Sequence, residues 1–208
     1  RLWGSFSFVA GNLLGGLTAD GLTSDWIAIV IALAMFGGAA IGMLLPQVPR
    51  HHPAQAAAAE TPVPARWAII VAVVIASSTI QASHSAIYGV SALAWSAQGL
   101  SNTMTGLLWM LGVLTEIVLF LRVGQSVSGM RRAFLFIALG GGLAVLRWFL
   151  MTFEPGLAVT MLCQLFHGLT FGATHLGMIA ALAVLSPPGM RSRIQGSNAA
   201  LQALLGSV

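Results

Sequence analysis

A few polar side chains that could bind a charged solute or carry a proton lie inside long apolar runs of the sequence. Glu116 is the only acidic residue well inside such a run. It is therefore neutral, paired with Arg147 or a histidine, or a carrier that loads and releases protons. His167 is a candidate for proton relay, because an imidazole ordinarily titrates near physiological pH. We expect Glu116 and His167 to carry protons, with a Glu116–Arg147 ion pair as the structural alternative.

Other residues of these runs are candidates for contact with a solute. The guanidinium of Arg147 is charged and forked, so it suits a carboxylate, whether that of Glu116 or that of a bound solute. His84 lies near the middle of the run 67–97 and is expected to contact a solute or to hydrogen-bond a neighbouring helix. Trp109 could stack against a ring or simply pack. The sequence leaves both interpretations of these side chains open.

The polar residues recur at helical spacing. At 100° per residue, those of the run 67–97 fall within an arc of about 80°. They are Ser77, Gln81, His84, Tyr88, Ser91 and Trp95. Stripes also occur in two later runs, formed by Thr105, Trp109, Gly112 and Glu116 and by Gln164, His167, Thr174 and His175. Polar groups of apolar helices normally face a bundle interior or a wet cavity, so these stripes predict a common central cavity.

The elements that position these residues are helices long enough to cross a bilayer. Hydrophobic residues make up 57% of the 208 and charged residues 7%, and the mean hydropathy is +0.90. A soluble domain would carry about a quarter charged residues, and a helical span needs about 20 mostly apolar residues. The pattern predicts an all-α polytopic membrane bundle. Its expected spans are residues 2–19, 25–45, 67–97, 103–122, 133–153, 157–185 and an unfinished one from 194 onward.

One connection differs from the others. Residues 46–66 are rich in Pro and Ala and lack helical periodicity, which is typical of a flexible linker between two bundles. Arginine placement sets the orientation, because positive residues concentrate on the cytoplasmic side. With Arg1 cytoplasmic, the linker and residues 122–132 and 186–193 lie on that side. It then holds Arg1, Arg50, Arg66, Arg122, Arg131, Arg132, Arg191 and Arg193, and the other side holds no arginine or lysine.

Small residues and potential ligands add few constraints. The pairs Gly11–Gly15, Gly38–Gly42 and Gly168–Gly172 predict close contacts between helices. Cys163 is the single cysteine, so neither a disulfide nor a thiolate metal site is expected. The pair His51–His52 in the linker has no further ligand candidate nearby. We therefore expect no cofactor and no metal.

Four stretches of the sequence resemble one transporter family. RLWGSFSFVAGNLLGG at the start, SALAWSAQGLS at 91–101, LRWFL at 146–150 and LFHGLTFGATHLG at 165–177 are similar to the major facilitator superfamily. More narrowly, they resemble its phenylpropionate-permease-like branch, which is related to lactose permease and to nucleoside–proton symporters. The resemblance implies two six-helix halves around a midplane site. Residues 1–45 would then end the N-terminal half, 46–66 would link the halves, and 67–208 would form most of the C-terminal half, covering about spans 5–11 of 12.

The resemblance also implies roles for single residues. Arg1 resembles the substrate-binding arginine at the start of the sugar permeases' fifth span. Glu116, Arg147 and His167 look like their eighth-span glutamate, ninth-span arginine and tenth-span histidine. Where those permeases place a proton-carrying glutamate one turn after the histidine, this chain has Leu169 and Thr170. That proton site therefore does not carry over, and Glu116 or His167 would have to replace it.

The function expected from all of this is secondary active transport in the inner, cytoplasmic membrane. The leading hypothesis is alternating-access proton symport of a small organic solute, such as an aromatic carboxylate like phenylpropionate, by a monomer in the lipid bilayer. Its expected substrate-binding residues are Arg1, Gln81, His84, Tyr88, Trp109 and Arg147. Efflux of drugs or metabolites by the same fold is the alternative. A haem-binding or enzymatic membrane protein is a remote one, because no motif for such chemistry is present, and no nucleic-acid partner is expected.

Overall fold

The computed structural model describes residues 2–44, 66–124 and 126–207, and these form helices joined by turns. Two helices, α1 (Leu2–Gly21) and α2 (Ser24–Leu44), precede residues 45–65, which include most of the expected linker and are not described. The remaining elements are α4 (Trp67–Ala97), α5 (Asn102–Val123), α6 (Met130–Met151), α7 (Leu157–Leu165), the π-helix η1 (Gly168–Ala173), α8 (Thr174–Leu185) and α9 (Arg191–Gly206). The predicted all-α class is confirmed.

Helix boundaries follow the apolar runs closely. The long helix α4 begins at Trp67 and ends at Ala97, as its run predicts, and the other ends differ from prediction by a few residues. Within the described residues, five segments are long and apolar enough to cross a membrane, taking α7, η1 and α8 together as one. Helices α1, with 20 residues, and α9, with 16, are not among them.

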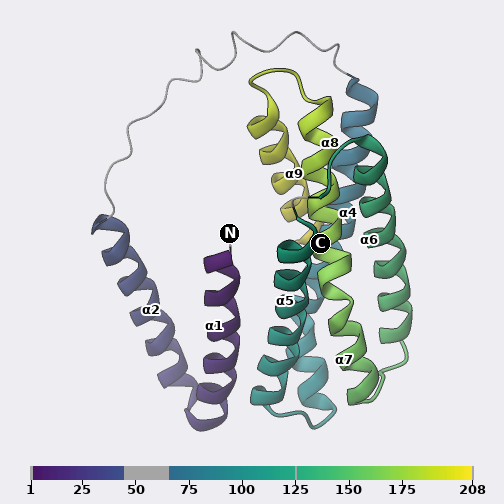
Figure 1. Cartoon of the computed structure of the whole chain (residues 1–208). Coiled ribbons are helices and arrows are strands. Elements are labelled where there is room, and N and C mark those ends of the chain that lie inside the picture. The colour runs from purple at the N-terminus through teal and green to yellow at the C-terminus, as the bar shows by residue number, and fades with distance from the viewer. Residues whose placement is uncertain (1, 45–65, 125, 208) are drawn as a thin grey trace.

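The helices from α4 to α9 form one bundle, and α1 lies against it (Figure 1). Helix α4 packs on α8 and α9, and α6 packs on α8. Buried Ile70, Val73, Ala181, Leu182 and Ile194 belong to the apolar core of this bundle. Helix α1 packs along α5, while α2 lies beside α1 and apart from the other helices. The face of α5 toward α1 is therefore where the first pair of helices meets the rest.

Glycine sets the distance between α1 and α5, although not at the predicted positions. A Cβ added at Gly16 would lie 2.7 Å from the Asn102 carbonyl oxygen and 3.1 Å from Thr103 Cα. Gly106 on α5 faces the Asn12 carbonyl in the same way. At Gly11 and Gly15 an added Cβ would meet no described atom within 4 Å. The close contact thus lies one residue beyond the predicted pair, because the rotation of α1 is fixed by its packing on α5.

The other predicted glycine pairs divide. At Gly38 and Gly42 of α2, an added Cβ would meet no described atom within 4 Å. At Gly168 it would lie 2.6 Å from the Thr115 backbone carbon, and at Gly172 2.9 Å from Leu119 Cδ2. The glycines of the π-helix are therefore close-contact residues against α5, as predicted.

The turn between α1 and α2 is tied to the start of α5. Asp20 Oδ1 accepts a hydrogen bond from the Asn102 N–H at 2.9 Å, and Oδ2 accepts one from the Thr103 N–H at 2.8 Å. The Thr103 hydroxyl also donates to Asp20. Unpaired N–H groups at a helix start attract negative charge. Asp20 therefore caps α5 from a different helix and fastens α1 to it.

Candidate functional site

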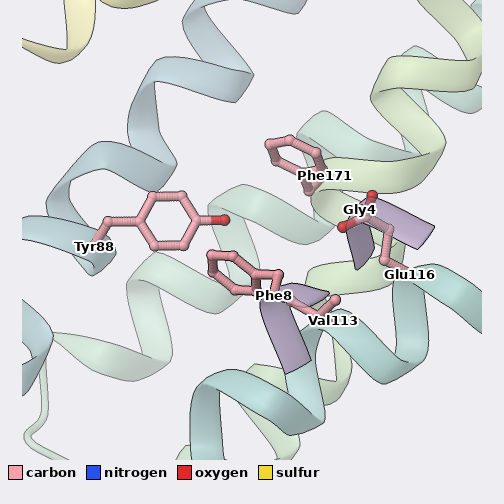
Figure 2. Close-up of a pocket in the computed structure, with 6 residues that line it drawn as sticks. All are labelled: Gly4, Phe8, Tyr88, Val113, Glu116 and Phe171. Carbon is pink, nitrogen blue, oxygen red and sulfur yellow. The ribbon is translucent and has the colours of Figure 1, made fainter. Parts of the chain in front are cut away.

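A pocket opens between α1 and the bundle, about halfway along α5. It has a volume of about 210 Å³ and is lined by Gly4, Phe8, Tyr88, Val113, Glu116 and Phe171. These residues come from α1, α4, α5 and η1, so four separate elements build its walls. Figure 2 shows the Tyr88 hydroxyl and the Glu116 carboxylate reaching in from opposite sides, with Phe8 and Phe171 between them. Among its described lining residues, Glu116 is the one with a charged side chain.

A smaller cavity of about 10 Å³ adjoins this pocket and shares Phe8, Tyr88 and Val113 with it. Trp109, Gln164 and His167 line only the smaller cavity. Gly112 also lines it and lets His167 lie close to α5, since a Cβ there would be 3.2 Å from His167 Cβ. The polar stripes of three helices therefore do converge on one region, as their spacing predicts.

Behind the pocket wall lies a buried chain of hydrogen bonds. Arg147 is only 1% exposed, and its Nη2 donates to Gln164 Oε1. Its Nη1 lies 3.4 Å from His167 Nδ1, and His167 Nε2 lies 3.3 Å from the Tyr88 hydroxyl oxygen. Tyr88 is 41% exposed, so the chain leads from a fully buried cation to a side chain that faces the pocket.

The geometry assigns a proton position on His167. An arginine side chain has donors but no acceptor, so His167 Nδ1 accepts from Arg147 and carries no hydrogen. The hydrogen of the neutral ring is then on Nε2, which donates to the Tyr88 oxygen. The Tyr88 hydroxyl hydrogen remains free to point into the pocket. A fully buried cation thereby orients, through His167, the side chain of Tyr88, which lines the pocket.

The same wall is tied to α4 through η1. His84 Nε2 lies 3.0 Å from the Thr170 hydroxyl, and His84 Nδ1 lies 3.0 Å from the Ile80 carbonyl. Gln81 Nε2 donates to the Phe171 carbonyl at 3.2 Å, while Gln81 Oε1 is buried with no partner among the described residues. Single π-turns inside α-helices occur often at functional sites, because they re-aim side chains. Here the π-turn follows His167 directly and carries Phe171 into the pocket wall.

Glu116 and Arg147 do not pair in this structure. Within the described residues no ion pair joins them, and the two terminal guanidinium nitrogens contact Gln164 and His167. The third guanidinium nitrogen, Arg147 Nε, is buried and has no hydrogen-bond partner among the described residues. The carboxyl of Glu116 faces the pocket (Figure 2). The geometry thus gives no support to the structural alternative for Glu116.

The expected site residues fall into three groups. Tyr88, Trp109, Glu116 and His167 line the pocket or its small neighbour. Gln81, His84 and Arg147 lie buried behind that wall and line neither cavity. Arg1 lies outside the described residues. The linker pair His51–His52, which was not expected to form a site, also lies outside them.

Sequence reasoning missed Phe8, Val113 and Phe171. Apolar side chains in an apolar helix give no sign of whether they face lipid or a cavity, so the stripes of polar residues could not mark them. The spacing of Phe171, four residues after His167, was the one available signal. In the structure the two rings stack, with centroids 5.3 Å apart and planes 9° apart.

The structure shows no metal site in the residues it describes, 2–44, 66–124 and 126–207. In these ranges no three His, Cys, Asp or Glu side chains are grouped so that they could hold a metal ion. Cys163 in α7 is buried and free. The titratable groups at the described site include the carboxyl of Glu116, the imidazoles of His84 and His167, the phenol of Tyr88 and the buried guanidinium of Arg147.

Comparison with known proteins adds the family. The chain is 30% identical over 194 residues to the protein described as "Probable 3-phenylpropionic acid transporter" of Escherichia coli (strain K12). The match covers 88% of this chain and 48% of that protein, so the chain spans about half the length of the curated relative. No solved structure matches the chain significantly. The MFS_1 like family matches residues 1–208, which confirms the resemblance to the major facilitator superfamily. The chain belongs to this family of multi-pass membrane proteins.

Proposed function

We propose that the protein is a proton symporter that imports a small aromatic carboxylate across the cytoplasmic membrane by alternating access. The observation that carries the proposal is the pocket between α1 and the bundle. In this pocket the carboxyl of Glu116 lies opposite the hydroxyl of Tyr88. Glu116 has no ion partner among the described residues, and Tyr88 is oriented by His167 and Arg147. A relative named for a phenyl carboxylic acid supports the choice of solute.

Each polar group has a role in this proposal. Glu116 takes up a proton on the side of higher proton concentration and releases it on the other, as a symporter requires of one group at least. The Tyr88 hydroxyl donates to the carboxylate of the solute, and Trp109 holds the Tyr88 ring edge-on at 6.2 Å. Arg147 fixes the tautomer of His167. His167 therefore acts through its position rather than as an independent proton carrier.

The arrangement of the ends supports the proposed orientation. The α1–α2, α4–α5 and α6–α7 turns lie at one end of the molecule, and the α8–α9 turn and the start of α4 lie at the other (Figure 1). Asp20 and Glu154 belong to the first end, and Arg66 and Arg191 to the second. By the positive-inside rule, we assign the second end, and with it residues 46–66, to the cytoplasm. Residues 1–45 and 67–208 then belong to two halves that meet at α1 and α5, and the protein works as a monomer.

Uptake into membrane vesicles tests the proposal. Vesicles that contain the complete protein should accumulate labelled 3-phenylpropionate when an inward proton gradient is imposed, and a protonophore should abolish the accumulation. Control vesicles without the protein should show only slow diffusion. Accumulation that persists with the protonophore would contradict proton symport. Extrusion of the solute from loaded vesicles against its gradient would contradict import and favour the efflux alternative.

A further inference from the structure

Three aromatic rings from three different elements form the walls of the pocket. Phe8 comes from α1, Tyr88 from α4 and Phe171 from η1. Figure 2 shows all three directed toward the same space. Val113 and the backbone at Gly4 complete the apolar part of the lining. Such walls favour an aromatic guest, because aromatic pairs add about 0.5–1.5 kcal/mol to the effect of burial alone.

Two of the three rings are held from behind. Phe171 stacks on His167 and meets His84 edge-on, with ring centroids 5.4 Å apart in the second pair. Tyr88 meets Trp109 edge-on, and the Trp109 indole N–H donates to the Ser91 hydroxyl at 3.0 Å. Side chains fixed in this way lose little freedom when a guest binds, which favours affinity and selectivity. Phe8, 43% exposed on α1, has no such ring contact among the described residues and lines the pocket from the α1 side.

The size and polarity of the pocket limit the guest. A volume of about 210 Å³ equals the liquid volume of about seven waters. Only the Tyr88 hydroxyl and the Glu116 carboxyl offer side-chain polar atoms among its described lining residues. A disaccharide or a nucleoside needs many hydrogen-bond partners, and a buried polar group without one costs about 1–3 kcal/mol.

We propose that this pocket is a subsite for an aromatic ring, in which Phe8 and Phe171 select aromatic solutes over saturated rings, disaccharides and nucleosides. That the solute carries a carboxylate rests on the proposed function. The binding of its ring is assigned to Phe8 and Phe171. Phe8 and Phe171 are thus specificity-determining residues, separate from Glu116.

Calorimetric titration of the complete, detergent-solubilised protein tests the subsite without any proton gradient. Phe8→Leu and Phe171→Leu should each raise the Kd of 3-phenylpropionate by about 2–12-fold, the equivalent of one lost aromatic contact. The Kd of 3-cyclohexylpropionate should change by less than about 2-fold, because a saturated ring makes no such contact. Phe171→Tyr keeps the ring and should retain the preference for the phenyl solute.

Phe6→Leu is the matched control. Phe6 lies on the same helix as Phe8 and is 52% exposed, but it does not line the pocket. Its replacement should leave both Kd values unchanged. Equal losses for the phenyl and cyclohexyl solutes in Phe8→Leu, or displacement of 3-phenylpropionate by lactose or uridine, would overturn the subsite. Selective binding together with uptake that ignores the proton gradient would instead retain the subsite and overturn symport.

Discussion

At the scale of single residues, the fully buried Arg147 contributes the fixed geometry of its hydrogen-bond donors as well as a positive charge. Its terminal nitrogens contact Gln164 and His167, and the contact with His167 determines which imidazole nitrogen carries the hydrogen. A lysine would keep the charge but not the fork, so it could not hold both partners in this geometry. In the proposed function, Arg147 orients, through His167, the Tyr88 hydroxyl that reaches the solute.

Replacement of Arg147 should therefore separate orientation from ion pairing. Arg147→Lys should lower kcat/KM by about 10-fold and Arg147→Ala by about 100-fold, in line with charged hydrogen bonds worth about 1.5–3 kcal/mol. The measurement is initial uptake in vesicles, normalised to the amount of folded protein. Combining Arg147→Ala with Glu116→Gln should recover nothing, because no ion pair joins these residues. Partial recovery in the double variant would restore the structural-pair interpretation.

Tyr88→Phe tests the end of the chain that faces the pocket. It deletes the hydroxyl while keeping the ring, so it should raise KM for 3-phenylpropionate by about 10–150-fold, the equivalent of one hydrogen bond to a charged group. The affinity for the neutral alcohol 3-phenylpropanol should fall less, since it has no charge for the donor to meet. Equal losses for the acid and the alcohol would show that Tyr88 serves only as a wall.

At the scale of elements, the contact between α1 and α5 depends on glycine and on a helix cap. Gly16 and Gly106 allow the two backbones to approach, and Asp20 binds the N–H groups of Asn102 and Thr103. Both devices act near the same end of the helices. In an alternating-access cycle this end has to separate, so the contact must be strong enough to close and weak enough to open.

Gly16→Ala should disrupt the approach, because its Cβ would lie 2.7 Å from the Asn102 carbonyl oxygen. Overpacking of this kind costs about 1–3 kcal/mol, and the midpoint of thermal unfolding should fall by roughly 2–10 °C. Gly15→Ala, one residue earlier, meets no described atom within 4 Å and is the matched control. If both variants melt alike, the close approach of α1 and α5 is not a stabilising contact.

Asp20 gives this contact a dependence on pH. The hydrogen bond from the Thr103 side chain, followed by that from the Thr103 backbone, lowers the pKa of the Asp20 carboxyl below its ordinary value of 3.8. The charged form is therefore the one that stabilises the contact, fully so above the ordinary pKa and less as the pH falls through the lowered pKa. Asp20→Asn should melt below the parent at pH 7, and the difference should shrink below about pH 4. A difference that stays constant from pH 7 to pH 3 would show that the charge of Asp20 does not matter.

Helix positions could be predicted because each apolar run ends in a polar or glycine-rich break, as at Ala97 and Leu185. The register of contacts could not, since rotation of a helix by one residue depends on its partner. That is why Gly16, rather than Gly15, meets α5. The π-helix η1 (Gly168–Ala173) was not predicted either, because a change in the hydrogen-bond register of a helix does not alter its pattern of apolar residues.

At the scale of the whole molecule, the site is shared between segments distant in sequence. The polar stripes predicted that α4, α5 and the run 157–185 converge, and the pocket and the smaller cavity lie where they meet. They did not predict the partners of Arg147, since pairing across helices depends on depth and rotation together. Nor did they indicate that an apolar residue of α1, Phe8, forms part of the wall. A site between α1 and the bundle is what an alternating-access carrier needs, because relative movement of the two would change its exposure.

In the proposed function, Glu116 carries the proton that drives accumulation of the solute. Glu116→Gln mimics the protonated side chain, so this variant should still exchange labelled for unlabelled 3-phenylpropionate across vesicle membranes. It should fail to accumulate the solute when an inward proton gradient is imposed, because the amide cannot release a proton. The decisive measurement is the ratio of internal to external solute at steady state under that gradient, in parent and variant. For Glu116→Gln we expect a ratio near one with exchange retained. Accumulation equal to that of the parent would show that Glu116 does not carry the proton.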